Sequence, residues 1–142
     1  MEARALDQCH AIVIYQNGEQ VLAERFKGPS LNRPVAIKSV SKTLIAALLG
    51  TAIDSGEIPS VKTTLGELAP ELIPTGADPN VAGITIENLV TMQAGLQRTS
   101  GPNYNSWITS SNWVANALSR PMVVEPGTRC LLYTSPSPRD RG

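Results

Sequence analysis

The chain has 142 residues, which is the length of one ordinary domain or of part of a larger one. Its 12 basic and 12 acidic residues leave no formal net charge, which argues against a nucleic-acid or anionic-membrane partner held by bulk charge. The longest apolar run, residues 44–53, is shorter than the roughly 20 residues that span a bilayer, so we expect no transmembrane segment. Nothing in the composition indicates an oligomeric state.

The N-terminus and the cysteines limit the compartment and the redox chemistry. The first ten residues, MEARALDQCH, lack the charged-then-apolar pattern of a secretory leader. The default expectation is a cytoplasmic chain, and the alternative is a periplasmic or secreted protein whose true start is missing. Cys9 and Cys130 have neither the spacing of a disulfide framework nor that of a zinc site, so we expect two unpaired thiols.

Two β-branched segments predict an antiparallel hairpin near the N-terminus. These are residues 10–15, HAIVIY, and residues 21–26, VLAERF. Between them, Asn17 and Gly18 supply the positive φ angles of a two-residue hairpin turn. Such a hairpin is marginal alone and needs further strands or a helix on its face. Residues 27–34 then predict a loop.

The next segment, IKSVSKTLIAALLG at residues 37–50, predicts a helix. Apolar residues recur at helical spacing and are present nearly all round, which is typical of a buried central helix. Ser39 is expected at or near the N-cap, and Gly56 is the expected stop.

Short helices and turns are predicted for the remainder, and no further strand is predicted. Residues 65–68 favour a short helix, and residues 98–107 favour a loop. Thr85 is expected to cap a helix over residues 86–93, with a stop at Gly95. Ser110 or Ser111 is expected to cap a further helix that ends before Pro121, and residues 125–128 predict a turn. Because a lone hairpin has an unpaired edge, we expect the front portion of something larger.

Ser39 and Lys42 carry the chemistry that the sequence suggests. Residues three apart share one helix face, so the Lys42 amine can reach the Ser39 hydroxyl. A serine needs a neighbour that takes its proton, and a desolvated lysine with a lowered pKa can do so. The positive end of the helix dipole also favours a nearby oxyanion. By spacing alone the signal is weak, because a capping serine followed by a solvated lysine is the more common origin of such a pair.

Several blocks in order resemble the penicillin-recognising serine hydrolases, closest to the class C β-lactamase and esterase branch. SVSKT at residues 39–43 resembles their active-site segment. GITIENLVTMQAGL at residues 83–96 is similar to their ITIRHLLTMTSGL-type segment, and residues 112–129 are similar to their W…L…P…PGT run. The hairpin fits the strands that open the family fold. The resemblance covers residues 11–129.

The resemblance implies an α+β fold of the α/β-sandwich type. An antiparallel sheet is flanked by helices, with a mostly helical second lobe, and only the front is expected here. Ser39 would be the acylated nucleophile, Lys42 its proton-transfer partner, and the Ser39 backbone N–H one half of the oxyanion hole. The substrate would be a small-molecule ester, amide or β-lactam, without any cofactor or metal. The alternatives are a non-catalytic penicillin-recognising sensor and a small helical interaction domain.

The sequence departs from the family after Arg129. The family's second motif predicts a tyrosine at position 132, but Leu132 stands there and Tyr133 is one place late, which would change the direction of its side chain. The tail CLLYTSPSPRD, residues 130–140, resembles a translated sequencing adapter. We therefore expect residues 1–129 to be the N-terminal part of the hydrolase domain and residues 130–142 to be a non-native tail, so that the chain as printed is inactive.

Other candidate residues are expected to have structural roles. His10 is the single histidine and is expected at a strand end. Trp107 and Trp113 are expected to pack against a helix or core, although both could line a pocket. Ser41 is expected to be a small packing residue, and Tyr104 has no assignable place.

Overall fold

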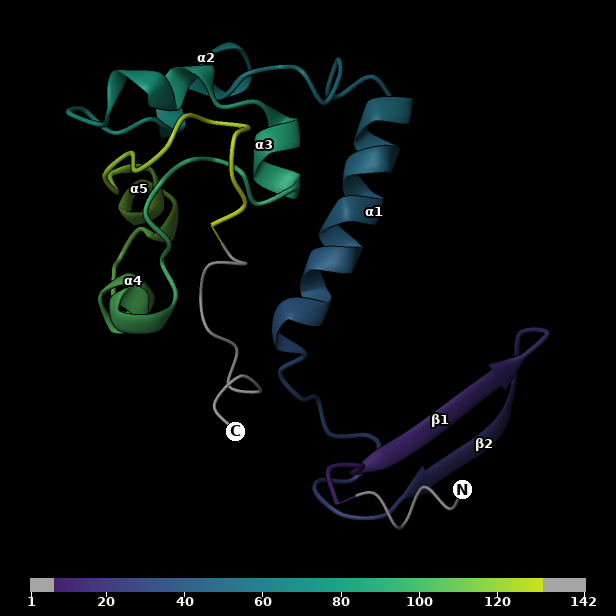
Figure 1. The fold of residues 1–142 in the computed structure, drawn as a ribbon. Coiled ribbons are helices and arrows are strands. Elements are labelled where there is room, and N and C mark those ends of the chain that lie inside the picture. The colour runs from purple at the N-terminus through teal and green to yellow at the C-terminus, as the bar shows by residue number, and fades with distance from the viewer. Residues whose placement is uncertain (1–6, 132–142) are drawn as a thin grey trace. The chain divides into compact units, whose positions relative to one another are not determined.

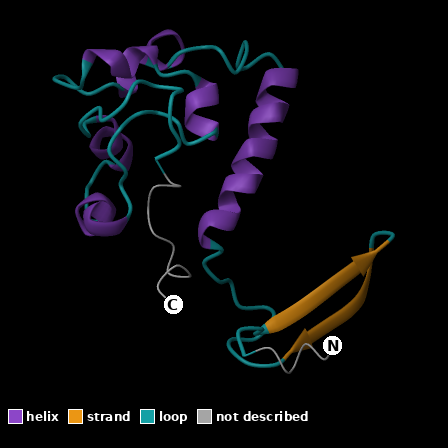
Figure 2. Cartoon of the chain, in the orientation of Figure 1, coloured by secondary structure: helices purple, strands orange, loops and turns teal. Residues whose placement is uncertain are grey.

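The computed structural model describes residues 7–131 and divides the chain into two compact units, residues 1–41 and 42–142. The first unit contains a hairpin and the second is helical (Figures 1 and 2). Among the described residues, no helix has the length and apolarity that crossing a membrane requires. Both cysteines are free thiols.

The hairpin predicted from the sequence is confirmed. Strands β1 (Ala11–Gln16) and β2 (Glu19–Arg25) pair antiparallel, and the register shifts between Ile14 and Tyr15. Asn17 and Gly18 turn the chain at φ angles of 52° and 83°, as a tight turn requires. At the open end, the backbone N–H groups of Phe26 and Lys27 both donate to the His10 carbonyl.

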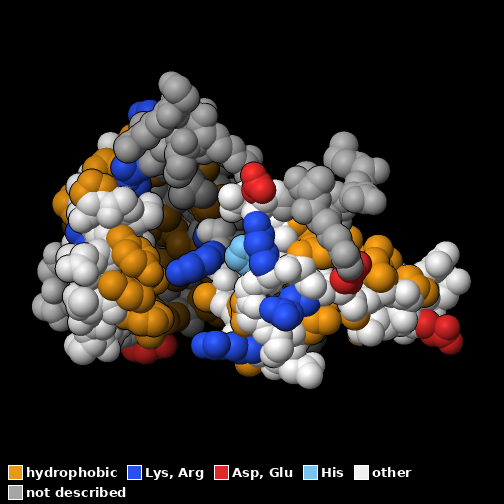
Figure 3. Space-filling view, turned by 90° about the horizontal axis from the view of Figure 1, so that it is seen from below, with side chains coloured by type: hydrophobic (Ala, Val, Ile, Leu, Met, Phe, Trp, Pro, Cys, Tyr) orange, Lys and Arg blue, Asp and Glu red, His pale blue; other side chains and the backbone are white. Residues whose placement is uncertain are grey.

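The faces of this hairpin are open within the described part of the chain. Val13 and Ile14 are neighbours in β1 and therefore point to opposite faces, yet they are 47% and 42% exposed. The described residues form a sheet of two strands only, so a flanked sandwich is not seen in this part of the chain. Figure 3 shows apolar side chains open on the face that it draws.

Helix α1 (Ser41–Asp54) follows a single 3-10 turn, η2 (Lys38–Val40). It ends as predicted, because Gly56 takes a φ of 78° and its N–H donates to the Ile53 carbonyl. The prediction that the helix is buried is wrong for this chain: α1 has no buried residue, and Leu48 is 61% exposed. An all-round apolar helix needs neighbours on every side, and the described residues do not supply them.

The core of the second unit lies among its short helices. Leu65, Val81, Ile84 and Leu118 form a buried cluster in which Val81 and Ile84 are fully enclosed. The helices of this unit that follow α1 are α2 (Leu65–Leu68), η3 (Pro70–Leu72), η4 (Pro79–Gly83), α3 (Ile86–Val90), η5 (Gly101–Asn103), α4 (Tyr104–Ile108) and α5 (Trp113–Leu118).

Two capping boxes fix the start of α2 and of α3. The Thr64 hydroxyl accepts from the Glu67 N–H, and the Glu67 carboxylate accepts from the Thr64 N–H. Thr85 and Asn88 repeat this arrangement in α3, which confirms Thr85 as an N-cap. The two starts are joined, because the Leu65 N–H donates to the Ile84 carbonyl and the Ile86 N–H to the Thr63 carbonyl.

Three sequence predictions in this unit need correction. Helix α3 ends at Val90 instead of residue 93, because Met92 turns the backbone to a φ of 60°. Helix α5 is capped by Asn112, whose side-chain oxygen accepts from the Ala115 N–H, and not by either preceding serine. Residues 104–107, the end of the expected loop, belong to the single-turn helix α4.

Candidate active site

The backbone places Ser39 inside a helical turn. Ser39 lies two residues before the first residue of α1, near the helix start as expected, but the N-cap of η2 is Ile37 and no side chain caps that turn. The hydroxyl that bonds the turn belongs to Ser41, which donates to the Lys38 carbonyl at 2.7 Å. Ser41 is therefore exposed and locally bonded, in contrast to the packing role that we expected.

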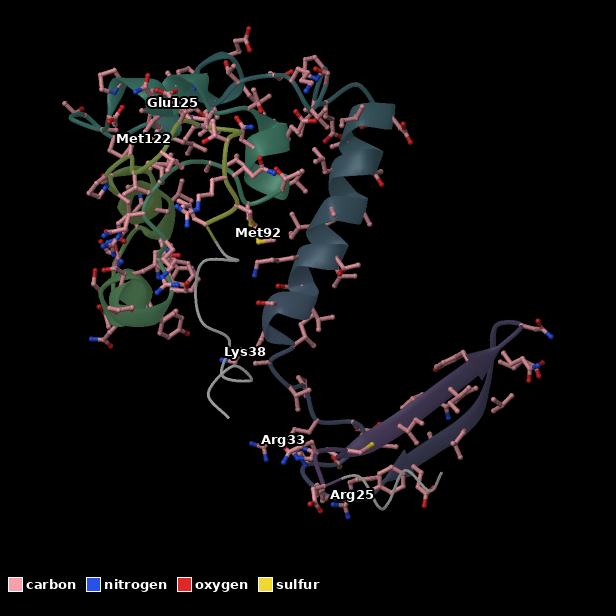
Figure 4. All side chains as sticks on the ribbon, in the orientation of Figure 1. Arg25, Arg33, Lys38, Met92, Met122 and Glu125 are labelled. Carbon is pink, nitrogen blue, oxygen red and sulfur yellow. The ribbon has the colours of Figure 1, made fainter. Side chains whose placement is uncertain are left out.

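Lys38, directly before Ser39, has an unusual backbone conformation. Its φ of 50° lies in the left-handed region, which for a residue with a Cβ costs about 1 kcal/mol. Figure 4 labels Lys38 at the turn that leads into α1. Strained backbone of this kind is common at functional sites, where the neighbouring structure holds it. Nothing in the sequence KSVSK marks this conformation in advance, because lysine has no preference for it.

Lys42 is the second residue of α1 and lies three positions after Ser39. Both residues are exposed. The desolvation expected of Lys42 is not present, because Val40, Leu44 and Ile45 are between 57% and 65% exposed. The structure therefore gives both residues helical backbone conformations, and the proton transfer between their side chains stays a prediction.

A second feature links two segments that resemble the family, residues 83–96 and residues 112–129. Residues 93–97 and 121–127 run side by side, with an isolated antiparallel bridge between Leu96 and Met122. The Gln97 N–H donates to the Pro121 carbonyl at 2.9 Å, and the Gly127 N–H donates to the Gln93 carbonyl at 2.8 Å. These bonds fix the position of the Pro-Gly-Thr turn and hence the point where the chain leaves it.

Gly95 lies at the centre of this pairing. Its φ is 80°, and a Cβ there would lie 2.3 Å from the Val124 carbonyl oxygen and 2.8 Å from the Met122 sulfur. Its own carbonyl accepts from the Val123 N–H at 2.9 Å. The sequence predicted Gly95 only as a helix stop, because close approach by residues 121–127 depends on segments that are distant in the sequence.

An apolar hollow lies beside the C-terminal half of α1. It has a volume of about 370 Å³, and its lining consists of aliphatic side chains only: Ile45, Leu48, Leu49, Ala52, Ile58, Leu89 and Val90. Such a surface offers no polar group to orient a substrate, whereas binding sites need a few. We therefore do not assign it a part in the chemistry.

The contacts of the other candidate residues indicate structural roles. His10 is exposed at the open end of the hairpin, and its ring lies against Gly28. The rings of Trp107 and Trp113 lie 5.2 Å apart, and the Trp107 Nε1–H donates to the Trp113 carbonyl, which is the helix packing that we expected. Tyr104 extends this cluster, with its ring 6.0 Å from that of Trp107. Leu132 and Tyr133 lie outside the described residues.

Comparison with protein families identifies the superfamily. The Beta-lactamase family model matches residues 3–137, which is most of the chain, and the chain belongs to this family. The match runs past Arg129 into the segment that we expected to be foreign. No curated protein matches the chain. Membership supports a serine hydrolase superfamily, which implies small-molecule substrates.

Proposed function

We propose that the parent protein is a serine hydrolase that acts through an acyl-enzyme at Ser39. The observation that carries this proposal is a Ser-x-x-Lys sequence at the entrance to α1, in a chain of the Beta-lactamase family. Ser39 attacks the carbonyl carbon of an ester, an amide or a β-lactam. Lys42 accepts the serine proton and passes it to the alcohol oxygen or amine nitrogen, whose bond to the carbonyl carbon breaks. The acyl group remains on the Ser39 oxygen until water hydrolyses that ester.

The local backbone supports this assignment. Ser39 lies in the 3-10 turn η2 and Lys42 in the first turn of α1, and residues three positions apart in a helix share one face, which is the spacing that the proposed proton transfer requires. The Ser41 hydroxyl donates to the Lys38 carbonyl, so it has a local role in holding the turn that carries Ser39. We also propose that residues 130–142 are a non-native tail.

The test uses the protein encoded when the gene continues past Arg129 with its own sequence. A fluorescent penicillin and a chromogenic ester are offered to the wild type and to the Ser39→Ala, Lys42→Met and Ser41→Ala variants. We expect Ser39→Ala to lose labelling and to lose hydrolysis by on the order of 10⁴-fold or more, because the nucleophile and its base act as one unit. Lys42→Met should lower acylation to a similar extent.

Ser41→Ala is the matched control, since it removes a neighbouring hydroxyl and should keep at least half of the activity. Retention of hydrolysis by Ser39→Ala would refute the proposal. Stable labelling of Ser39 without turnover would instead identify a sensor that stalls at the acyl-enzyme.

A further inference from the structure

A polar hollow lies between α4 and α5 in the helical unit, and it uses neither Ser39 nor Lys42. Its volume is about 390 Å³, which is the size of a small-molecule site. Its polar lining has one charged residue and no acidic one: Ser106, Ser110, Asn112, Asn116, Ser119 and Arg120. Helices α4 and α5 lie next to each other in Figure 1.

The Arg120 guanidinium is held in place by neutral groups. Its Nη2 donates to the Ser106 hydroxyl at 3.0 Å and to the Asn116 side-chain oxygen at 3.3 Å. Its Nε is buried and has no hydrogen-bond partner in the described part of the chain. The structure also records no ion pair for Arg120 among residues 7–131. A guanidinium that is partly removed from water normally has a carboxylate or phosphate partner.

The remaining hydrogen-bonding capacity of the hollow consists mainly of donors. The Asn112 side-chain oxygen already accepts from the Ala115 N–H, and the Asn116 oxygen accepts from Arg120. Each amide therefore offers its Nδ2 hydrogens, and Arg120 offers its Nη1 hydrogens. Several donors and one positive charge, with no competing carboxylate, form an environment that selects an anion.

We propose that this hollow binds a small molecule through its carboxylate group. A carboxylate oxygen accepts from the Nη1 hydrogens of Arg120, and the Asn112 and Asn116 amides donate to the carboxylate oxygens. Because the guanidinium has separate donor nitrogens, Nη2 stays bonded to Ser106 and Asn116 while Nη1 is offered to the ligand, so Arg120 acts through its geometry as well as through its charge. The Ser106 and Asn116 contacts orient the guanidinium before the ligand arrives.

The experiment titrates the ¹⁵N-labelled 142-residue chain with succinate, with inorganic phosphate and with sodium chloride at matched ionic strength. We expect succinate to shift the Arg120 Nε–H resonance and the amides of residues 106–121 in a saturable manner. Arg120→Gln should abolish saturation, and Arg120→Lys should weaken binding at least tenfold although the charge is kept. Ser106→Ala, which releases Nη2 but keeps the guanidinium, should weaken binding severalfold.

Arg33→Gln is the control, because it removes an exposed arginine from the other unit and should leave the titration unchanged. Shifts that chloride reproduces, or that Arg120→Gln retains, would overturn the proposal. Tighter binding of phosphate than of succinate would overturn the carboxylate assignment. If Arg120→Gln does not fold, the proposal is judged from the response of the wild-type Nε–H resonance and from the affinity of Ser106→Ala. If the wild-type amide resonances of residues 106–121 lack the chemical-shift dispersion of a folded protein, that result counts against the site. None of these results bears on Ser39.

Discussion

Gly95 shows how one small residue fixes two distant segments. The Val123 and Val124 N–H groups both donate to its carbonyl, at 2.9 and 3.3 Å, and there is no room for a side chain. Gly95→Ala adds a Cβ that overlaps the Val124 carbonyl oxygen at a φ of 80°. We expect a loss of about 2–4 kcal/mol in the free energy of unfolding, from backbone strain and displacement of residues 121–127.

Gly50→Ala is the matched control for this prediction. Gly50 lies within α1, and nothing lies within 4 Å of the Cβ that alanine would add. Alanine there should be neutral or stabilising by up to about 1 kcal/mol. Urea unfolding followed by circular dichroism measures both variants. Equal stability of the two would show that residues 121–127 do not depend on the space at Gly95.

Among the secondary-structure elements, helix α2 is stabilised at its start by a titratable group, the Glu67 carboxylate. Hydrogen bonds from the Thr64 backbone and side chain lower the pKa of Glu67 below its ordinary value of 4.5. A carboxyl whose pKa is lower in the folded state adds stability above its unfolded pKa, and this contribution is lost as the pH falls through the folded value. We therefore expect Glu67→Gln to destabilise the protein at pH 7 and to converge with the wild type as the pH falls below the folded-state pKa of Glu67.

Glu71→Gln provides the comparison for this prediction, because Glu71 is an exposed carboxylate in the neighbouring η3. Thermal melts of wild type and both variants from pH 3 to pH 7 measure the effect. A pH-independent difference between Glu67→Gln and wild type would contradict the role of the charged cap.

At the scale of the whole molecule, exposed apolar surface determines how we expect the 142-residue chain to behave in solution. The hairpin and α1 leave Val13, Leu44 and Leu48 open, and Ser39 has no dry surroundings in the described residues. We expect the 142-residue chain to bind an apolar dye such as ANS, to show no labelling by a fluorescent penicillin and to hydrolyse no ester. The protein encoded by the continued gene is the control. Rapid labelling of Ser39 in the short chain would contradict this expectation.

Local signals accounted for much of the backbone. Asn17-Gly18 predicted the hairpin turn, Gly56 the end of α1, and Thr85 the start of α3, because each depends on residues within one turn. The 3-10 turn at Ser39 and the left-handed Lys38 were missed, since no side chain in that segment specifies them. The donor-rich hollow at Arg120 was also missed, because α4 was expected as a loop and Ser106 is 14 residues from Arg120.

The sequence by itself determined the superfamily, the hairpin and the Ser-x-x-Lys spacing, because these are properties of neighbouring residues and of ordered blocks. The tertiary structure decided that residues 121–127 close over Gly95 and that Arg120 joins α4 to α5. It also decided that the apolar α1 is exposed in this chain. Burial and long-range pairing depend on which surfaces meet in space, and hydrophobic periodicity indicates only which surfaces are able to do so.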